Sequence, residues 1–170
     1  TTYDGREIAF NSNEDTLTIV DVTNKAAPVQ LSRTTYPQRR YAHQGWLSGD
    51  HQFFFMNDEL DEPSYAATTR THIWDVRDLD NAVYVGHYSA EVTSRDHNLY
   101  VDDGLIYAAN YASGLRVLDP TVDPATGTPQ LTEIGYLDTY ATDDNPDFDG
   151  AWSVYPFFDS GTITVNDRKN

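Results

Sequence analysis

The stretch Ile73-Trp74-Asp75 ends a short apolar run and has two counterparts in this chain. The same order of two apolar residues and an aspartate occurs at Ile19-Val20-Asp21 and at Val117-Leu118-Asp119. Asp75 and Asp119 are 44 residues apart. Internal repeats of about 40–50 residues, each made of four strands, are typical of β-propellers. The repeated tripeptide therefore predicts an all-β chain built from similar units.

Two further anchors recur in the same order along the chain. A polar pair opens an apolar run at His43-Gln44 and again at His97-Asn98, and Ala151 occupies the corresponding place in the next unit. Apolar runs also close in asparagine, and Asn110 and Asn166 are 56 residues apart. The members of this last set are Phe10-Asn11, Met56-Asn57, Ala109-Asn110 and Val165-Asn166.

Short alternating or aromatic runs bounded by Gly, Pro, Asn and Asp indicate strands, and helical periodicity is nearly absent. We therefore expect thirteen strands and no helix. The expected strands are 6–11, 16–22, 29–35, 43–47, 52–57, 69–76, 82–89, 97–101, 105–110, 115–119, 131–139, 151–157 and 162–166.

Grouped by the anchors, these strands predict a partial β-propeller of four-stranded antiparallel blades. About three blades' worth of strands are present: an incomplete blade at 1–36, complete blades at 42–90 and 96–140, and an incomplete blade at 150–170. All belong to a single propeller domain, 1–170. Because a propeller needs about four blades to close, we expect missing blades or another protein chain to complete the ring.

The composition excludes several classes of partner. The 170 residues contain 27 Asp and Glu against 11 Lys and Arg, for a net charge of −16, and no cysteine. Nucleic acids and anionic lipids both attract basic proteins, so this acidic protein is not expected to bind either. Without cysteine there is no disulfide framework and no thiolate metal site. No apolar stretch reaches the ~18 residues of a membrane-spanning helix.

Several stretches, in order and over nearly the whole chain, resemble the choice-of-anchor B family of LVIVD-repeat proteins. Two of them are His43-Gln44-Gly45-Trp46-Leu47 and Asp96-His97-Asn98-Leu99-Tyr100. The others are residues 5–22, 57–62, 109–116 and 150–158. The chain departs from the family pattern at Ala9, where the family often has Cys, and at its end, which precedes the family's closing strand.

The resemblance implies a bacterial β-propeller protein that is extracellular or held at the cell surface. Members are about twice as long as this chain, so the resemblance also implies that this is a fragment whose amino-terminal blades are missing. The biochemical role of the family is largely unknown, and the resemblance therefore implies no activity.

Histidines at equivalent places in adjacent blades are the first candidate site. His43 and His97 each open the innermost strand of a blade, so both should lie near the propeller axis. Imidazoles so placed suit a divalent metal or a small polar ligand. Asp96 could orient the His97 ring, and Asn98 lies beside it. In the alternative interpretation each histidine hydrogen-bonds a neighbouring loop and only joins blade to blade.

Two acidic loops are the second candidate site, because alternating oxygen ligands around a tight turn often bind calcium. Connectivity places both loops on the propeller face that carries the histidines. The alternative interpretation is a solvated acidic turn. The candidate calcium ligands are Asp58, Glu59 and Asp61 in one loop and Asp143, Asn145, Asp147 and Asp149 in the other.

These features predict a non-enzymatic surface propeller that serves as a binding or assembly scaffold, with Ca²⁺ as the candidate cofactor. The alternative is a metal-dependent hydrolase or lyase with its site at the propeller mouth. An enzyme would need a third group converging with His43 and His97, which the sequence pattern does not supply, so no catalytic residue is assigned.

Overall fold

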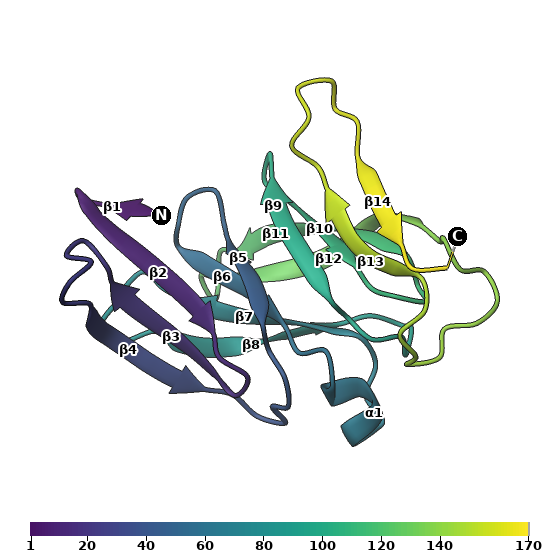
Figure 1. Cartoon of the computed structure of the whole chain (residues 1–170), viewed down its shortest axis with the longest axis horizontal. Helices are drawn as coiled ribbons and strands as arrows, with labels where there is room; N and C mark the ends of the chain where they lie inside the picture. Colours follow the sequence, from purple (N-terminus) through teal and green to yellow (C-terminus); the bar gives the residue numbers. More distant parts are fainter. Residues whose placement is uncertain (170) are drawn as a thin grey trace.

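The protein is all-β, as expected, and consists of three four-stranded antiparallel sheets followed by a two-stranded hairpin (Figure 1). A computed structural model describes residues 1–169. The first sheet comprises β1 (Thr2–Tyr3), β2 (Arg6–Ser12), β3 (Thr16–Asp21) and β4 (Val29–Thr35). The second comprises β5 (Gln44–Leu47), β6 (Phe53–Asn57), β7 (Arg70–Asp75) and β8 (Val83–Ser89). The third comprises β9 (Asn98–Asp102), β10 (Leu105–Ala109), β11 (Leu115–Asp123) and β12 (Thr128–Leu137). The hairpin comprises β13 (Ala151–Tyr155) and β14 (Thr164–Asp167).

All thirteen expected strands are present, with boundaries shifted by up to four residues. Two elements were not expected. The two-residue strand β1 pairs with β2, so the first unit has four strands where the sequence indicated three. The short helix α1 (Asp61–Tyr65) lies in the connection between β6 and β7. Both elements are too short to display a hydrophobic period, which is why the sequence pattern did not reveal them.

The second sheet is buried on both faces. Along β6, Phe54 and Met56 pack toward the first sheet, whereas Phe53 and Phe55 pack toward the third. This explains the unbroken apolar run of that strand, since neither face needs polar residues. Trp74 on β7 is fully buried in the same layer as Phe54.

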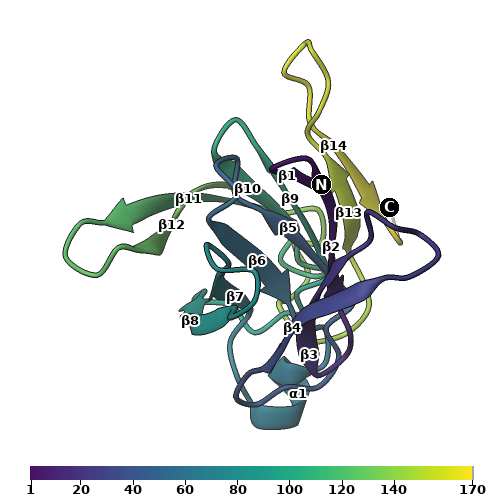
Figure 2. The ribbon, with the colours of Figure 1, turned by 90° about the vertical axis from the view of Figure 1, so that its left-hand side faces the viewer.

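The sheets follow one another across the molecule in chain order. The first long strands of successive units, β2, β5, β9 and β13, lie side by side (Figure 1). The far end of the β11–β12 hairpin projects beyond the other strands (Figure 2). Within residues 1–169, none of the four sheets closes on itself. No helix in this part of the chain has the length and apolar character needed to cross a bilayer.

Candidate metal centre

Three connections gather at one end of the sheets. They are residues 58–69 between β6 and β7, residues 90–97 between β8 and β9, and residues 138–150 between β12 and β13. Arg95 joins all three, because its guanidinium donates to the carbonyl oxygens of Glu59, at 2.8 Å, and Pro146, at 2.7 Å. The ring of Phe148 lies 4.2 Å below the same guanidinium. This is the convergence of loops that the strand order predicted.

Backbone pairing places His43, Glu59 and His97 around one point. The buried residue Ala42 forms a two-way bridge with Glu14 of the first sheet, which fixes the chain just before His43. The Glu59 amide donates to the carbonyl oxygen of Tyr41 at 3.1 Å. The two imidazole centroids lie 5.0 Å apart. The structure therefore brings the two histidines together and adds a glutamate between them.

The ligand atoms of this His43–Glu59–His97 centre lie close together, at separations longer than those of ordinary hydrogen bonds. His43 Nε2 is 3.4 Å from Glu59 Oε2, and His97 Nε2 is 3.7 Å from Glu59 Oε1. Ordinary N–H···O bonds have donor–acceptor distances of about 2.7–3.2 Å. Two ligands each about 2.1 Å from a tetrahedral zinc ion are about 3.4 Å apart. The separations of 3.4 and 3.7 Å fit two ligands of one metal ion better than two hydrogen-bonded partners.

The hydrogen bond made by His97 Nδ1 determines whether Nε2, the nitrogen that faces Glu59, carries a proton or a lone pair. His97 Nδ1 lies 2.5 Å from the carbonyl oxygen of Trp152, which only accepts hydrogen bonds, so Nδ1 carries the proton. Asn98 donates to the same oxygen at 3.1 Å. Burial lowers the pKa of His97, which keeps the ring neutral. Neutral Nε2 therefore turns its lone pair toward the centre, as a metal ligand does.

Glu59 is held as a carboxylate by its neighbours. Burial alone would raise the pKa of Glu59, but interactions with His43, with the Tyr111 hydroxyl and with His97 outweigh burial and lower it. Tyr111 is fully buried and donates to Glu59 Oε1. Burial and the nearby Glu59 charge raise the pKa of Tyr111, so its hydroxyl stays protonated as a donor. The centre thus combines an anionic carboxylate with a neutral imidazole.

One side of the centre opens to a polar cavity. The side chain of His43 is 28% exposed, against 11% for Glu59 and 5% for His97. A cavity of about 360 Å³ adjoins it, lined by His43 and Asn98 together with the amides of Asn11 and Gln44. A small polar molecule can therefore reach the centre from the His43 side.

The acidic run 58–62, expected to act together on calcium, divides into three parts. Asp58 is buried and anchors the preceding chain: it accepts from the Tyr36 hydroxyl at 2.6 Å and from the amides of Arg40 and Tyr41 at 2.5 and 2.6 Å. Glu59 joins the histidines. Asp61 lies apart from both, beside Asp96. Asp58 therefore has a structural role, which the calcium interpretation missed.

Asp96 does not orient the His97 ring, because Nδ1 of that ring donates to the carbonyl oxygen of Trp152 instead. It forms a second carboxylate group with Asp61 and Glu62, all three buried. Burial and the charge of Asp61 raise the pKa of Glu62 to about 9. Burial and the charges of Glu62, Asp61 and Asp58 raise the pKa of Asp96 well above its usual range.

The other predicted calcium loop does not form a ligand cluster. Asp143 accepts from the amide of Asn145 at 3.0 Å, Asp149 pairs with Lys169, and Asp147 is exposed. Among residues 1–169, acidic and histidine ligand atoms converge at the His43–Glu59–His97 centre and at the group of Asp61, Glu62 and Asp96. The four aspartates of this loop, Asp143, Asp144, Asp147 and Asp149, belong to neither.

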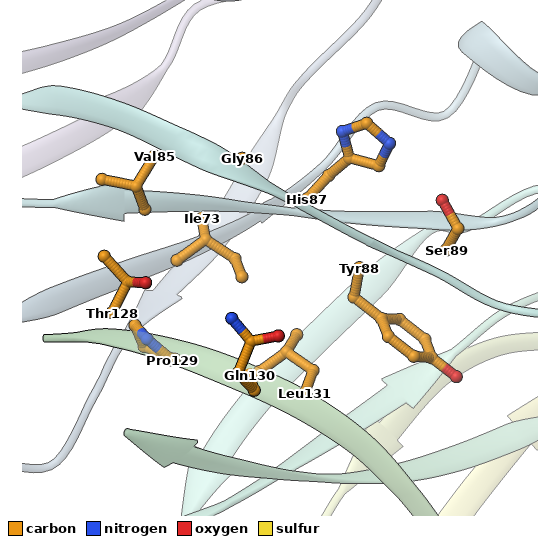
Figure 3. A pocket seen from close by; sticks show the side chains of 10 residues that line it. All are labelled: Ile73, Val85, Gly86, His87, Tyr88, Ser89, Thr128, Pro129, Gln130 and Leu131. Carbon is orange, nitrogen blue, oxygen red and sulfur yellow. The ribbon is translucent and has the colours of Figure 1, made fainter. Parts of the chain in front are cut away.

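A further hollow of about 260 Å³ lies between the outer strands β8 and β12 (Figure 3). Ile73 and Leu131 point into it, whereas the imidazole of His87 points away from Leu131 (Figure 3). His87 Nδ1 instead lies 3.2 Å from the Tyr84 hydroxyl. The β12 residues that line this hollow are not titratable, so none of them could act together with His87. The hollow therefore does not resemble a reactive site.

Several residues near the two groups were not predicted as site residues. Tyr111 carried no recognisable motif, and its position depends on a loop conformation that the sequence does not display. Arg70 and His72 gave a usable signal, because they alternate on one face of β7 where apolar residues are expected. Both are buried and face Asp61, at 3.0 and 3.4 Å.

No protein-family model and no curated protein sequence matches this chain.

Proposed function

We propose that His43, Glu59 and His97 bind a divalent transition-metal ion. The observation that carries this proposal is the convergence of one ligand atom from each of the three residues, with His43 Nε2 3.4 Å and His97 Nε2 3.7 Å from the two oxygens of Glu59. Such separations suit ligands of one metal ion. The orientation of the His97 lone pair toward the Glu59 carboxylate supports it, because a lone pair and an anion repel each other unless a cation lies between them.

Two imidazoles and one carboxylate form a ligand set that zinc and other late first-row ions accept. Magnesium and calcium prefer ligand sets made only of oxygen, so they fit this centre poorly. Trp152 and Asn98 fix the His97 ring from behind, and Tyr111 fixes Glu59. These outer contacts hold the donor atoms in place before the ion binds.

We further propose that the four sheets are part of a β-propeller with this centre near its axis, and that the protein is a non-enzymatic scaffold that binds a ligand or partner at this end. The packing of β5 and β13, each the first strand of its unit, on either side of the equivalent strand β9 supports the arrangement. The resemblance to the choice-of-anchor B family supports a place outside the cell or on its surface. Missing blades or a partner chain would complete the ring.

A metal-dependent hydrolase or lyase is the second candidate, and one observation favours it. Three protein ligands leave the fourth position of a tetrahedral ion open, as in catalytic rather than structural zinc sites. Of the three residues, His43 is the most exposed and also lines the polar cavity, which gives a small molecule a route to the centre. In this reading Glu59 and the histidines hold the ion and the cavity amides position a small polar substrate.

Calorimetric titration with Zn²⁺ tests the metal proposal. We expect the purified protein, stripped of metal, to bind one Zn²⁺ per chain at this centre. Glu59→Gln and His97→Ala should each weaken zinc binding by at least about 100-fold, because each removes a residue that binds the ion directly. Loss of a residue that only hydrogen-bonds a metal ligand already costs about 10–100-fold in affinity.

The control is His51→Asn, which removes a histidine from a distant turn. His51 has a φ of 60°, a conformation that asparagine tolerates. This variant should bind Zn²⁺ as the unmodified protein does. Equal zinc affinity in all variants would overturn the proposal. If zinc binds as proposed but the loaded protein cleaves no ester, amide or glycosidic test substrate, the scaffold is favoured over the hydrolase.

A further inference from the structure

Behind Glu59 lies a second group of carboxylates that the proposed transition-metal centre does not use. Asp61 and Glu62 begin α1, and Asp96 comes from the connection between β8 and β9. Their exposed fractions are 0%, 1% and 0%. One oxygen from each lies within 4.8 Å of one oxygen from each of the others. Two separate segments of the chain thus bring three carboxylates to one buried point.

Most of these oxygens have no hydrogen-bond partner. Within residues 1–169, no aligned hydrogen bond reaches either oxygen of Asp96 or Oε2 of Glu62. Glu62 Oε1 accepts from the Asp96 amide at 3.3 Å, and Asp61 forms an ion pair with Arg70. Buried polar atoms without partners are rare, and an unpaired buried carboxylate is costly. Asp96 in particular is wholly buried and directs a bare carboxylate at the other two.

The surrounding charges neutralise one of the three carboxylates. Arg70 Nη2 lies 3.0 Å from Asp61 Oδ2, and His72 Nε2 lies 3.4 Å from the same oxygen. His72 Nδ1 lies 3.1 Å from the Tyr84 hydroxyl, which can donate to it. In the described part of the chain, no Lys, Arg or His pairs with Glu62 or Asp96. When all three carboxyls are ionised, one guanidinium leaves two negative charges, which one divalent cation balances. Without a cation, the raised pKa values of Glu62 and Asp96 favour the protonated forms of these two carboxyls.

We propose that Asp61, Glu62 and Asp96 bind a calcium ion that ties α1 to the segment before β9. All the donor atoms are oxygens, which calcium prefers and zinc does not. Calcium takes six to eight oxygen ligands in a flexible geometry, whereas magnesium usually keeps several of its waters. A buried group of protein carboxylates therefore suits calcium better than magnesium.

This site is distinct from the His43–Glu59–His97 centre but adjoins it in the chain. Asp96 directly precedes His97, and Glu62 follows Glu59 by three residues. Calcium would therefore hold together the two segments that present Glu59 and His97. The site would stabilise the fold whether or not a transition metal binds next to it.

Thermal unfolding in calcium, magnesium or chelator at equal ionic strength tests the calcium proposal. A ligand that binds only the folded state raises Tm, and calcium at about 100 times its Kd should raise it by about 5–10 °C for a chain of this size. Magnesium should raise it by much less. Asp96→Asn and Glu62→Gln should abolish the calcium shift, and in chelator they should melt no lower than the unmodified protein, because each replaces a buried carboxyl that has no cation beside it by an amide of the same shape.

Two matched variants separate this site from the others. Asp147→Asn, in the exposed loop 143–149, should keep the full calcium shift. Glu59→Gln should also keep the full calcium shift in Tm. The calcium proposal can therefore be tested whether or not the transition-metal proposal holds. An unchanged Tm in calcium, or a full shift in Asp96→Asn, would overturn the calcium site. A shift lost in Asp147→Asn would place calcium in the exposed loop and overturn it equally.

Discussion

At the scale of single residues, the acidic run 58–62 shows how neighbouring carboxylates take different roles. Asp58 points back to the chain before β5, Glu59 points to the histidines, and Asp61 and Glu62 point to Asp96. The strand order predicted that this run faces His43 and His97. The direction of each side chain depends on α1 and on the partners of each carboxylate oxygen. Neither could be predicted from the order of residues in this run.

Asp58→Ala should lower the free energy of unfolding by at least about 3 kcal/mol. The substitution leaves the Tyr36 hydroxyl and the amides of Arg40 and Tyr41 without their acceptor, and each unpaired buried donor costs about 1–3 kcal/mol. Urea denaturation measures the loss. Asp147→Ala, at an exposed aspartate, is the control and should stay within about 0.5 kcal/mol. A loss below about 1 kcal/mol for Asp58→Ala would show that these bonds do not anchor the loop.

At the scale of elements, the loop between β10 and β11 holds Tyr111 against Glu59. Tyr111 has a φ of 38°, which is unusual for a bulky residue, and it bridges Ala151 in both directions, at 3.0 and 2.9 Å. Gly150 makes this approach feasible. It has a φ of 94°, and a Cβ at this position would overlap the carbonyl oxygen of Tyr111.

Gly150→Ala should therefore cost more than backbone strain alone. We expect a loss of about 2–4 kcal/mol in the free energy of unfolding, from the left-handed conformation and from displacement of the Tyr111 loop. Zinc affinity should fall with it, because Glu59 loses its fixed donor. Gly161→Ala, with a φ of 72° and open space around it, isolates the strain and should cost about 1 kcal/mol. Equal losses in the two variants, by denaturation and by zinc titration, would contradict the loop's role.

Most strands could be predicted from the sequence because they are long enough to show a pattern and are bounded by turn residues. β6 is a clear example, since its unbroken run of aromatic residues follows from burial on both faces. The elements that were missed, β1 and α1, are each determined by tertiary pairing rather than by local preference. α1 begins with Asp61 and Glu62 of the carboxylate group, and Glu59 lies two residues before it, so missing α1 also meant missing how these acidic residues divide.

At the scale of the whole molecule, the last unit has two strands where the other three have four. Within residues 1–169, β14 pairs only with β13. Beside it, the outer strand β12 exposes Ile134 by 55% and Tyr136 by 67%. A sheet edge with unpaired backbone next to exposed apolar side chains is a site for association.

The purified chain should therefore associate through this end rather than remain a monomer. Ile134→Lys combined with Tyr136→Lys should shift the sedimentation velocity profile toward monomer, because charges on an apolar face oppose its burial. Val122→Lys, at an apolar residue 46% exposed on the projecting end of β11, should leave association unchanged. A cooperatively unfolding monomer at all concentrations would argue against the propeller arrangement.

The metal site can be seen in a crystal structure of the zinc-loaded protein, with anomalous diffraction measured across the zinc absorption edge. We expect one strong anomalous peak about 2.0–2.2 Å from His43 Nε2, His97 Nε2 and a carboxylate oxygen of Glu59, with the fourth position open toward the cavity beside Asn98. The peak should be absent in crystals of Glu59→Gln soaked identically. A zinc-soaked structure in which His97 donates a direct hydrogen bond to Glu59 and the centre holds no anomalous density would contradict the metal proposal.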